Sequence, residues 1–241
     1  MLDQVTMGKR ASSRNRHPWL RRTLVAAVIL LEALVFLVVV FRFINPPVTT
    51  VMIAERLHGT HLQRDWVPLA NISGELPLAV IASEDGRFCD HWGVDWGAVK
   101  DAIKEVGRHG GEVRGASTIP MQTAKNLFLW TQRSFVRKGL EMPIAYLMSL
   151  FWSKQRMMEV YLNIAEWGPG VFGAEAASRY HFHKSAAALN RHEAALLAAA
   201  LPNPRVRNPG KPGGRLARIA RGVEQRMGMM APRAACVLSP N

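Results

Sequence analysis

The sequence predicts a mainly α-helical protein, with one membrane-spanning helix near the N-terminus followed by a single helical domain. Three observations lead to this prediction. Residues 23–41 (TLVAAVILLEALVFLVVVF) form a 19-residue apolar run with one charged residue, Glu32. Downstream of this run, apolar residues recur at helical spacing in several segments. The chain contains no strand-rich block, no internal repeat and no heptad array.

The charge of the chain indicates an anionic partner. The 241 residues have a formal net charge of +13, and 49% of them are hydrophobic, which is enough for a sizeable core. Residues 1–42 hold seven basic and two acidic residues, so +8 of the total remains with the other 199 residues. A basic domain attached to a membrane fits acidic lipid or a phosphorylated substrate. Nucleic acid is the least favoured partner, because the chain has no recognition motif and the domain is expected outside the cytoplasm.

The apolar run is long enough for an uncleaved membrane anchor. At about 1.5 Å per residue it reaches roughly 28 Å, close to the thickness of the hydrocarbon core. A cleaved signal peptide is the alternative, but its apolar stretch is usually about 7–15 residues long and ends in a small-residue site. This run instead continues into residues 41–47 (FRFINPP).

Basic residues before the run set the expected orientation, because cytoplasmic flanks are enriched in Lys and Arg. They are Lys9, Arg10, Arg14, Arg16, Arg21 and Arg22. We therefore expect three parts in the chain: a cytoplasmic tail (1–22), a transmembrane helix (23–43) and an extracytoplasmic domain (44–241).

Breaks and periodicity predict the remaining elements. Residues 48–57 fit either a short strand or a juxtamembrane helix, and Pro77 precedes a buried type of helical run. Glycines at 107, 110, 111 and 115 predict a mobile loop over 107–116, which we expect to act as a lid that becomes ordered when substrate binds. Further helices are expected over residues 95–109, from Pro120 onward, and over 135–152, 154–165, 172–181, 192–201 and 215–229.

The first candidate site is the acid pair Glu84-Asp85, which follows an apolar run. Adjacent residues of a helix point about 100° apart, so we expect the two acids to have different roles. Apolar surroundings raise the pKa of a carboxyl, and such a group suits general acid or base catalysis near neutral pH. A helix-capping surface acid is the alternative. His91 and Asp95 follow, and hydrogen bonds that order the loop are their expected role.

The second candidate site is residues 115–126 (GASTIPMQTAKN). Pro120 fits the first turn of a helix, and Ser117 or Thr118 can cap that helix. Gln122 and Lys125 are three residues apart, so they share one helix face. A helix N-terminus with a lysine can bind phosphate, but the spacing is not that of a Walker A loop. An ordinary capped surface helix is the alternative.

The third candidate site is Arg137, Lys138 and Glu141, which follow the predicted cap Ser134. Their spacing places the two cations and the carboxylate on one helix face. They form either an ordinary ion-pair cluster or a cationic clamp beside an ionised carboxylate. Two carboxylates and several phosphate-binding cations together indicate chemistry on a sugar whose leaving group is a phosphate.

Some polar residues predict structure more than chemistry. Tyr161 is expected in the core and Asn163 as a buried hydrogen-bonding group, while Glu175 could orient a substrate or a cation. Cys89 and Cys236 could form a disulfide in an oxidising compartment or remain as two free thiols. Neither has metal-ligand spacing.

In order along the chain, these motifs closely resemble those of the monofunctional biosynthetic peptidoglycan glycosyltransferases, relatives of the transglycosylase module of class A penicillin-binding proteins. The resemblance covers about Val48 to Pro209. Pro120 and Met121 stand where the family usually has a hydroxyl residue and a glutamine, and the residues before Lys184 also depart from its pattern. The matching segments are 84–95 (EDGRFCDHWGVD), 115–126, 137–141 (RKGLE), 154–163 (KQRMMEVYLN), 170–184 (GVFGAEAASRYHFHK) and 193–204 (EAALLAAALPNP).

The resemblance implies a lysozyme-like helical domain with a smaller membrane-proximal lobe. It implies an enzyme that polymerises lipid II into β-1,4 glycan strands, with inversion and release of undecaprenyl pyrophosphate. Glu84 would deprotonate the acceptor 4-hydroxyl, and Glu141 would assist at the donor. The implied substrate-binding residues are Asp85, Ser117, Thr118, Gln122, Lys125, Asn126, Arg137, Lys138 and Glu175, of which Lys125, Arg137 and Lys138 would hold the donor pyrophosphate.

The resemblance implies no protein-held metal and no required cofactor, although a divalent cation (Mg or Mn), if used, would sit on the pyrophosphate. It implies a single-pass protein of the cell inner membrane with a cytoplasmic N-terminus and a periplasmic catalytic domain. The expected partners are lipid II, the growing glycan, the lipid bilayer and proteins of cell-wall synthesis or division. The chain has no S-x-x-K motif, so crosslinking is expected from another protein. The alternatives are a peptidoglycan-cleaving glycoside hydrolase and a membrane-tethered binding protein.

Overall fold

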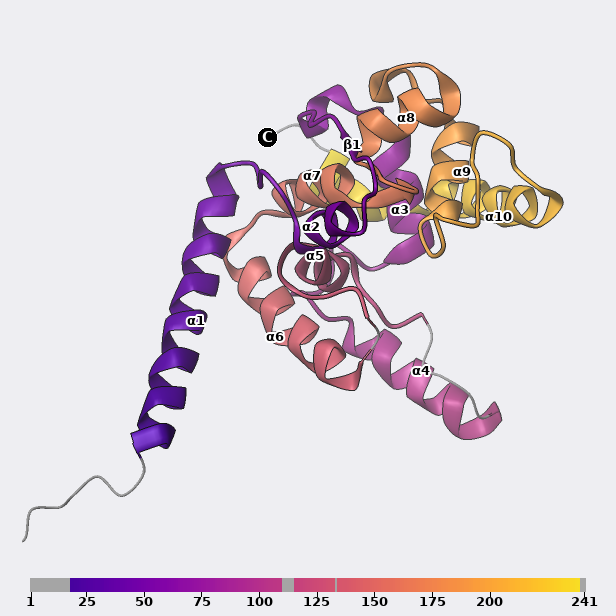
Figure 1. Cartoon of the computed structure of the whole chain (residues 1–241). Helices are drawn as coiled ribbons and strands as arrows, with labels where there is room; N and C mark the ends of the chain where they lie inside the picture. Colours follow the sequence, from indigo (N-terminus) through magenta and orange to yellow (C-terminus); the bar gives the residue numbers. More distant parts are fainter. Residues whose placement is uncertain (1–17, 110–114, 133, 239–241) are drawn as a thin grey trace, which may run out of the picture.

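The computed structural model describes residues 18–109, 115–132 and 134–238, and it confirms a mainly helical chain (Figure 1). In chain order the elements are α1 (Pro18–Phe43), α2 (Thr50–Leu57), β1 (Gln63–Arg64), η1 (Leu69–Asn71), α3 (Glu75–Glu84), α4 (Trp96–His109), α5 (Ile119–Phe128), α6 (Phe135–Phe151), α7 (Lys154–Ile164), β2 (Glu166–Gly168), β3 (Val171–Phe172), α8 (Ala174–Phe182), η2 (Ala186–Ala188), α9 (Arg191–Ala200), α10 (Gly214–Met230), η3 (Ala231–Ala234) and α11 (Ala235–Leu238).

Helix α1 is the predicted membrane helix, but it begins at Pro18, five residues before the expected start. Its Trp19–Phe43 segment is long and apolar enough to cross a membrane, and only 6% of its most apolar window is buried. The helix extends away from the rest of the molecule (Figure 1). Its C-terminal end is attached to the domain, because Trp152 Nε1 donates a hydrogen bond to the carbonyl of Val38 at 2.7 Å.

The segment after the anchor is a helix, which settles the alternative at residues 48–57. Thr49 caps α2 by accepting a hydrogen bond from the backbone N–H of Met52 at 3.1 Å. The hydroxyl of Thr50 donates to the carbonyl of Asn126 at 3.2 Å. Helix α2 is therefore joined to the end of α5.

The main core includes α3, α9 and α10, which pack on one another, and α7, which packs mainly against α5. Residues 76–82 of α3 are all buried, as are residues 194–200 of α9, most of which are alanines. Small side chains allow α9 to lie close to both α3 and α10. Tyr161 and Asn163 of α7 are 1% and 0% exposed, so their expected buried positions are confirmed.

A second, smaller cluster of apolar side chains lies between α4, α5 and α6. Val94, Met121 and Ala145 form it, apart from the main core. Gly93 (φ +93°) is needed here, because a Cβ atom would lie 2.7 Å from the carbonyl oxygen of Ala145. In Figure 1, α4 and α6 lie below α3, α8, α9 and α10, and α5 connects them to the main core because it packs against both α6 and α7.

A short three-stranded sheet was not predicted. Strand β3 pairs in parallel with β1 and antiparallel with β2. The helix expected from residue 172 therefore begins at Ala174. Gly170 (φ +74°) makes the β2–β3 turn, where a Cβ atom would lie 2.3 Å from the carbonyl oxygen of His61. Strands of two or three residues show no period-2 pattern, which explains the missed prediction.

One predicted loop boundary is wrong. Helix α4 continues to His109, so residues 107–109 are helical, and residues 110–114 of the predicted lid lie outside the described residues. The helices expected at 135–152, 154–165, 192–201 and 215–229 are found within one residue of their predicted bounds. Ser134 caps α6 as expected, accepting a hydrogen bond from the N–H of Arg137 at 3.0 Å.

Candidate active site

Glu84 is the last residue of α3, a helix whose preceding residues 76–82 are buried. Its carboxylate accepts hydrogen bonds from Gln122 Nε2 at 3.0 Å and from the hydroxyl of Ser83 at 3.2 Å. Burial raises the pKa of Glu84, while these two hydrogen bonds and the charge of Arg207 oppose the rise, and the charge of Asp85 adds to it. The predicted direction of the pKa shift is therefore confirmed, and its main cause is burial.

Asp85 and Glu84 form hydrogen bonds with different partners. Its carboxylate accepts a hydrogen bond from the backbone N–H of Ile119 at 2.9 Å and pairs with His91 Nε2 at 2.9 Å. Only 6% of Asp85 is exposed. Asp85 thereby joins the end of α3 to the start of α5, and these contacts give no support to its predicted contact with substrate.

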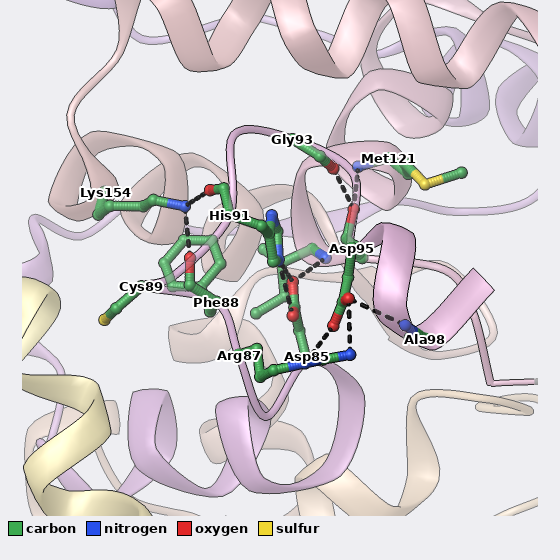
Figure 2. Close-up of polar contacts among 12 residues, drawn as sticks. Asp85, Arg87, Phe88, Cys89, His91, Gly93, Asp95, Ala98, Met121 and Lys154 are labelled. Atoms are coloured by element: carbon green, nitrogen blue, oxygen red, sulfur yellow. Dashed lines mark hydrogen bonds and ion pairs between the residues drawn. The ribbon is translucent and has the colours of Figure 1, made fainter. Parts of the chain in front are cut away.

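The segment after Asp85 is held from several sides (Figure 2). Asp95 forms an ion pair with Arg87 at 2.8 Å and accepts from the N–H of Ala98 at the start of α4. The ammonium of Lys154 donates to the carbonyls of Phe88 and His91. The loop-ordering role expected for His91 and Asp95 is confirmed.

A disulfide also holds this segment. Cys89 is bonded to Cys236 in α11, 147 residues away in sequence. The structure therefore decides against two free thiols. The C-terminal helix is covalently joined to the segment that directly follows Glu84.

Helix α5 connects the acid to the cations. Thr118 is its N-cap, accepting from the N–H of Met121, which settles the choice between Ser117 and Thr118. Gln122 donates to Glu84 and accepts from the hydroxyl of Tyr161 at 3.1 Å, so its amide orientation is determined on both sides. Pro120 and Met121, which depart from the family pattern, are both buried.

Lys125 lies three residues after Gln122, about 4.5 Å further along the same face of α5. Burial lowers the pKa of Lys125, the positive charges of Arg137 and Lys138 lower it further, and the carboxylates of Glu141 and Glu166 oppose this. Because Arg137, Lys138 and Glu141 of α6 affect the pKa of Lys125, the second and third candidate sites lie next to each other in the fold.

The cations of α6 converge on Glu141, as their spacing predicts. Lys138 Nζ lies 2.8 Å from one carboxylate oxygen, and Arg137 Nη1 lies 3.6 Å from the other. Glu141 is only 3% exposed, whereas 41% of the Lys138 side chain is exposed. Lys138 also donates to the hydroxyl of Ser117 at 2.6 Å. We call Lys125, Arg137, Lys138 and Glu141 the cation cluster.

Glu175 and Asn126 are two further predicted substrate-binding residues. The contacts given for them in the described part of the chain involve neither Glu84 nor the cation cluster. The Glu175 carboxylate accepts from the N–H of Ala186 at 2.7 Å and pairs with Arg179 at 2.7 Å, so its partners are structural. Asn126 is half-buried, and its backbone carbonyl binds Thr50.

Sequence reasoning missed four neighbours of the site: Ser83, Arg207, Glu166 and the Tyr161 hydroxyl. Glu166 begins β2 and Arg207 follows α9, so only the folded chain places their charges beside α5. Burial raises the pKa of Glu166, against the opposing charge of Arg205. No local pattern in the sequence connects these residues with Glu84 or Lys125.

The described residues contain no group of three or more His, Cys, Asp or Glu side chains that could hold a metal ion. The cation cluster supplies positive charge directly from the protein. A divalent cation therefore finds no such ligand set of its own in the described part of the chain.

The arrangement defines a class of protein. A half-buried carboxyl with a raised pKa can accept a proton, and a neighbouring set of cations can stabilise negative charge on a phosphate. Together with the helix suited to a membrane, they describe a membrane-associated enzyme site for a phosphate-bearing substrate.

The comparisons agree with that class. A family model described as transglycosylase matches residues 50–229. The chain is 50% identical over 212 residues to the biosynthetic peptidoglycan transglycosylase of Agrobacterium fabrum, covering 88% of this chain and 93% of that protein. Proteins with the same name from Rhodospirillum centenum and Pseudomonas fluorescens are each 48% identical, over 92% and 82% of this chain and 96% and 85% of their own lengths. The chain belongs to the transglycosylase family.

Proposed function

We propose that the chain is a peptidoglycan glycosyltransferase that polymerises lipid II into β-1,4 glycan strands. The observation that carries the proposal is the position of Glu84. Its carboxylate is held by Gln122, and Lys125 of the cation cluster lies one turn further along the same helix. The names of the relatives support glycan polymerisation in cell-wall biosynthesis.

In this mechanism Glu84 accepts the proton of the acceptor's 4-hydroxyl. The hydroxyl oxygen then forms a bond to C1 of the donor sugar as the bond from C1 to the pyrophosphate oxygen breaks, with inversion at C1. The acceptor hydroxyl is weakly acidic, so a base with a raised pKa is the harder requirement. Undecaprenyl pyrophosphate leaves with the electron pair of the broken bond.

The cation cluster binds the donor pyrophosphate. Lys125, Arg137 and Lys138 place positive charge where negative charge develops on the leaving group, which replaces a strong general acid. Glu141 holds the two cations of α6 in place and so assists at the donor. Ser117 binds Lys138 and lies at the same end of the site.

We further propose that the protein is a single-pass protein of the cell inner membrane, with a cytoplasmic N-terminus and a periplasmic catalytic domain. Basic residues before α1 support this orientation. The disulfide between Cys89 and Cys236 supports an oxidising compartment for the domain. Lipid II, the growing glycan and the bilayer are the partners that this placement requires, and other cell-wall synthesis proteins act on the product.

A glycan-cleaving enzyme is the nearest rival, because it too would use a carboxylate. Finished glycan has no pyrophosphate, so the cation cluster would then have no ligand. The test incubates the purified full chain with labelled lipid II and, separately, with finished sacculi. Polymer from lipid II, blocked by moenomycin, is the expected result. Release of soluble fragments from sacculi without any polymer from lipid II would contradict the proposal.

A further inference from the structure

The net positive charge of the domain is concentrated in its last part. Residues 201–241 contain eight basic residues and one acidic residue, so they carry +7. Residues 43–200 contain sixteen basic and fifteen acidic residues and carry only +1. The cation cluster lies within this nearly neutral part, because its members fall between residues 125 and 141. The charge of the last part therefore indicates a second anionic partner.

Helix α10 holds four of these eight basic residues. Every third or fourth residue of the helix is buried and forms the face that packs into the main core. These buried residues are Leu216, Ala220, Val223 and Met227. The arginines of the helix lie outside this face, and all of them are exposed. We call Arg215, Arg218, Arg221 and Arg226 the arginine face of α10.

The protein leaves most of this charge without a counterion. Arg215, Arg218 and Arg221 form no hydrogen bond or ion pair with another residue in the described ranges. The one acidic residue of the helix, Glu224, is directed to α9, where its carboxylate lies 2.6 Å from His192 Nδ1. The arginine face is thus free to bind anions from outside the chain.

Helix α4 shows that exposed cations alone do not make such a face. Its exposed cations are Lys100, Lys104 and Arg108. Asp101 and Glu105 alternate with them and are also exposed, so the helix carries a net charge of only +1. Opposite charges at this spacing are typical of an ordinary solvated helix. On α10, by contrast, four cations and one acid leave a net charge of +3.

The position of α10 fits the level of the outer headgroups. The apolar run of α1 ends at Phe41 and is followed by Arg42. With α1 across the bilayer, this end of the helix lies at the boundary between hydrocarbon and headgroups. In Figure 1, α10 lies at about the height of this end of α1, on the other side of the main core. Helices α4 and α6 lie lower, beside the middle of α1, and α6 exposes the apolar side chains of Phe135 and Val136.

The arginine face is also turned toward the membrane side. Helix α10 packs against α9 and α3, and in Figure 1 α9 lies above it. The buried residues of α10 make these contacts, so the exposed side of the helix is directed away from α9, toward the level at which α4 and α6 lie. A row of cations at headgroup level that is directed to the bilayer matches an anionic lipid surface.

We propose that the arginine face of α10 binds the anionic phospholipid headgroups of the bilayer that α1 crosses. The guanidinium groups donate hydrogen bonds to phosphate oxygens, and the negative surface potential attracts their charge. Helices α1 and α10 then attach the domain to the membrane on two sides of the main core, which fixes the tilt of the active site above the bilayer. The proposal rests on α1 crossing the membrane, but it does not require polymerase activity.

The test measures how close α10 lies to lipid headgroups when the full chain is held in lipid nanodiscs. A fluorophore is attached through Gln225→Cys, because Gln225 is exposed between the arginines and the two native cysteines are bonded to each other. Lipids with a nitroxide on the headgroup quench it on contact. Neutral discs contain phosphatidylcholine, and anionic discs also contain phosphatidylglycerol. We expect at least twofold more quenching in the anionic discs, and no difference at about 0.5 M salt, where screening shortens the Debye length to about 4 Å.

Charge removal assigns the contact to α10. Each cation beside an anionic membrane strengthens binding roughly fivefold, so loss of three should abolish the extra quenching. The first variant combines Arg215→Gln, Arg218→Gln and Arg221→Gln. The control removes the same charge from the exposed side of α4 and should keep the extra quenching. It combines Lys100→Gln, Lys104→Gln and Arg108→Gln. Equal loss in both variants would show an effect of net charge alone and overturn the assignment.

Equal quenching in neutral and anionic discs would overturn the proposal, and the salt series tests it in the parental chain even where a variant does not fold. The growing glycan is the other anionic candidate, because its peptide stems carry carboxylates. Soluble glycan fragments that change the fluorescence in neutral discs, without any effect of phosphatidylglycerol, would assign the face to the product instead. Lipid II polymerisation is measured in the same discs, so an inactive chain with the extra quenching would contradict the polymerase function alone.

Discussion

Glu84 and the cation cluster are held by different kinds of contact. Glu84 ends a buried helix, and its main partner, Gln122, is 38 residues away in sequence. Its neighbour Asp85 binds Ile119, and the segment beyond is bonded to Cys236. The cations of α6 instead meet Glu141 from three and four residues away. Of these two cations, Arg137 is only 9% exposed, whereas 41% of the Lys138 side chain is exposed.

The difference follows from what each group must do. A base needs a raised pKa, which requires burial, and burial depends on distant parts of the chain packing around the carboxyl. Phosphate-binding cations need charge and access for the ligand, and one helical turn can supply their mutual geometry. Long-range packing therefore controls proton transfer, whereas Arg137, Lys138 and Glu141 meet locally and only Lys125 is brought to the donor site by packing of α5 against α6.

The largest effect should come from Glu84→Gln. Removing the base should lower polymerisation of lipid II by about 10²- to 10⁴-fold, the usual contribution of general base catalysis. Glu75→Gln is the matched control, because Glu75 starts the same helix and pairs at its surface with Arg191. The measurement is polymer formation with labelled lipid II. Parental activity in a folded Glu84→Gln chain would refute the role of Glu84.

The same variant separates catalysis from stability. Because burial raises the pKa of Glu84, the folded state holds that proton more tightly than the unfolded state does. Stability then falls as the pH rises through the interval between the ordinary and the raised pKa. Glu84→Gln removes this loss, so its melting temperature at pH 8 should equal or exceed the parental value. A marked decrease would indicate a structural role instead.

The next largest effect tests whether the disulfide between Cys89 and Cys236 holds the segment after Glu84 in place. Cys236→Ser should lower the free energy of unfolding by about 2–4 kcal/mol, because the disulfide closes a long loop in the unfolded chain. The measurement is chemical denaturation with and without a reductant. Reductant should destabilise the parent and leave the variant unchanged. A parental chain that is equally stable when reduced would show that noncovalent contacts alone hold this segment.

A smaller effect is expected in the cation cluster. Lys125→Ala should weaken donor binding by roughly 10- to 100-fold, the range for hydrogen bonds to charged groups. Lys100→Ala, on the exposed face of α4, is the control. Donor affinity is measured with a non-reactive lipid II analogue. The pH at which activity declines should stay parental in both variants, and unchanged donor affinity in Lys125→Ala would contradict the clamp.

The smallest effect should come from Gln122→Met. Loss of the hydrogen bond to Glu84 removes an interaction that lowers its pKa, so the pKa of Glu84 should rise further. Because the ionised carboxylate is the active form, activity should then be lost at a higher pH than in the parent as the pH falls. At pH 7 the rate should decrease about 2- to 10-fold, as expected for one hydrogen bond. A pH–rate profile that does not move would show that Gln122 does not tune the base.

Several features could be predicted from short sequence patterns. The apolar run predicted the membrane-type helix, and five helices (α4, α6, α7, α9 and α10) lie within one residue of their predicted bounds. The spacing of Arg137, Lys138 and Glu141 predicted their contacts, because residues three and four apart always meet on a helix. Apolar residues before Glu84 predicted the direction of its pKa shift.

Contacts between distant segments were not predictable in the same way. The pairing of Cys89 with Cys236 was left open, and strands β1 to β3 were too short to show a period. Asp85 and Glu175 were expected to bind substrate, but the contacts that the structure shows for them are with the chain itself. The charges of Arg207 and Glu166 reach the site only after β2 and the segment beyond α9 have packed around α5.

The sequence by itself determined most of the helices, the membrane-type helix and the contacts of Arg137 and Lys138 with Glu141, because each depends on residues within one or two helical turns or on one continuous apolar run. Only the tertiary structure decided which amide meets Glu84, which cysteines pair and which distant charges lie beside Glu84 and Lys125. These outcomes depend on burial and on contacts across tens to more than a hundred residues. Such contacts form when helices from separate parts of the chain exclude water together, and no local pattern encodes them.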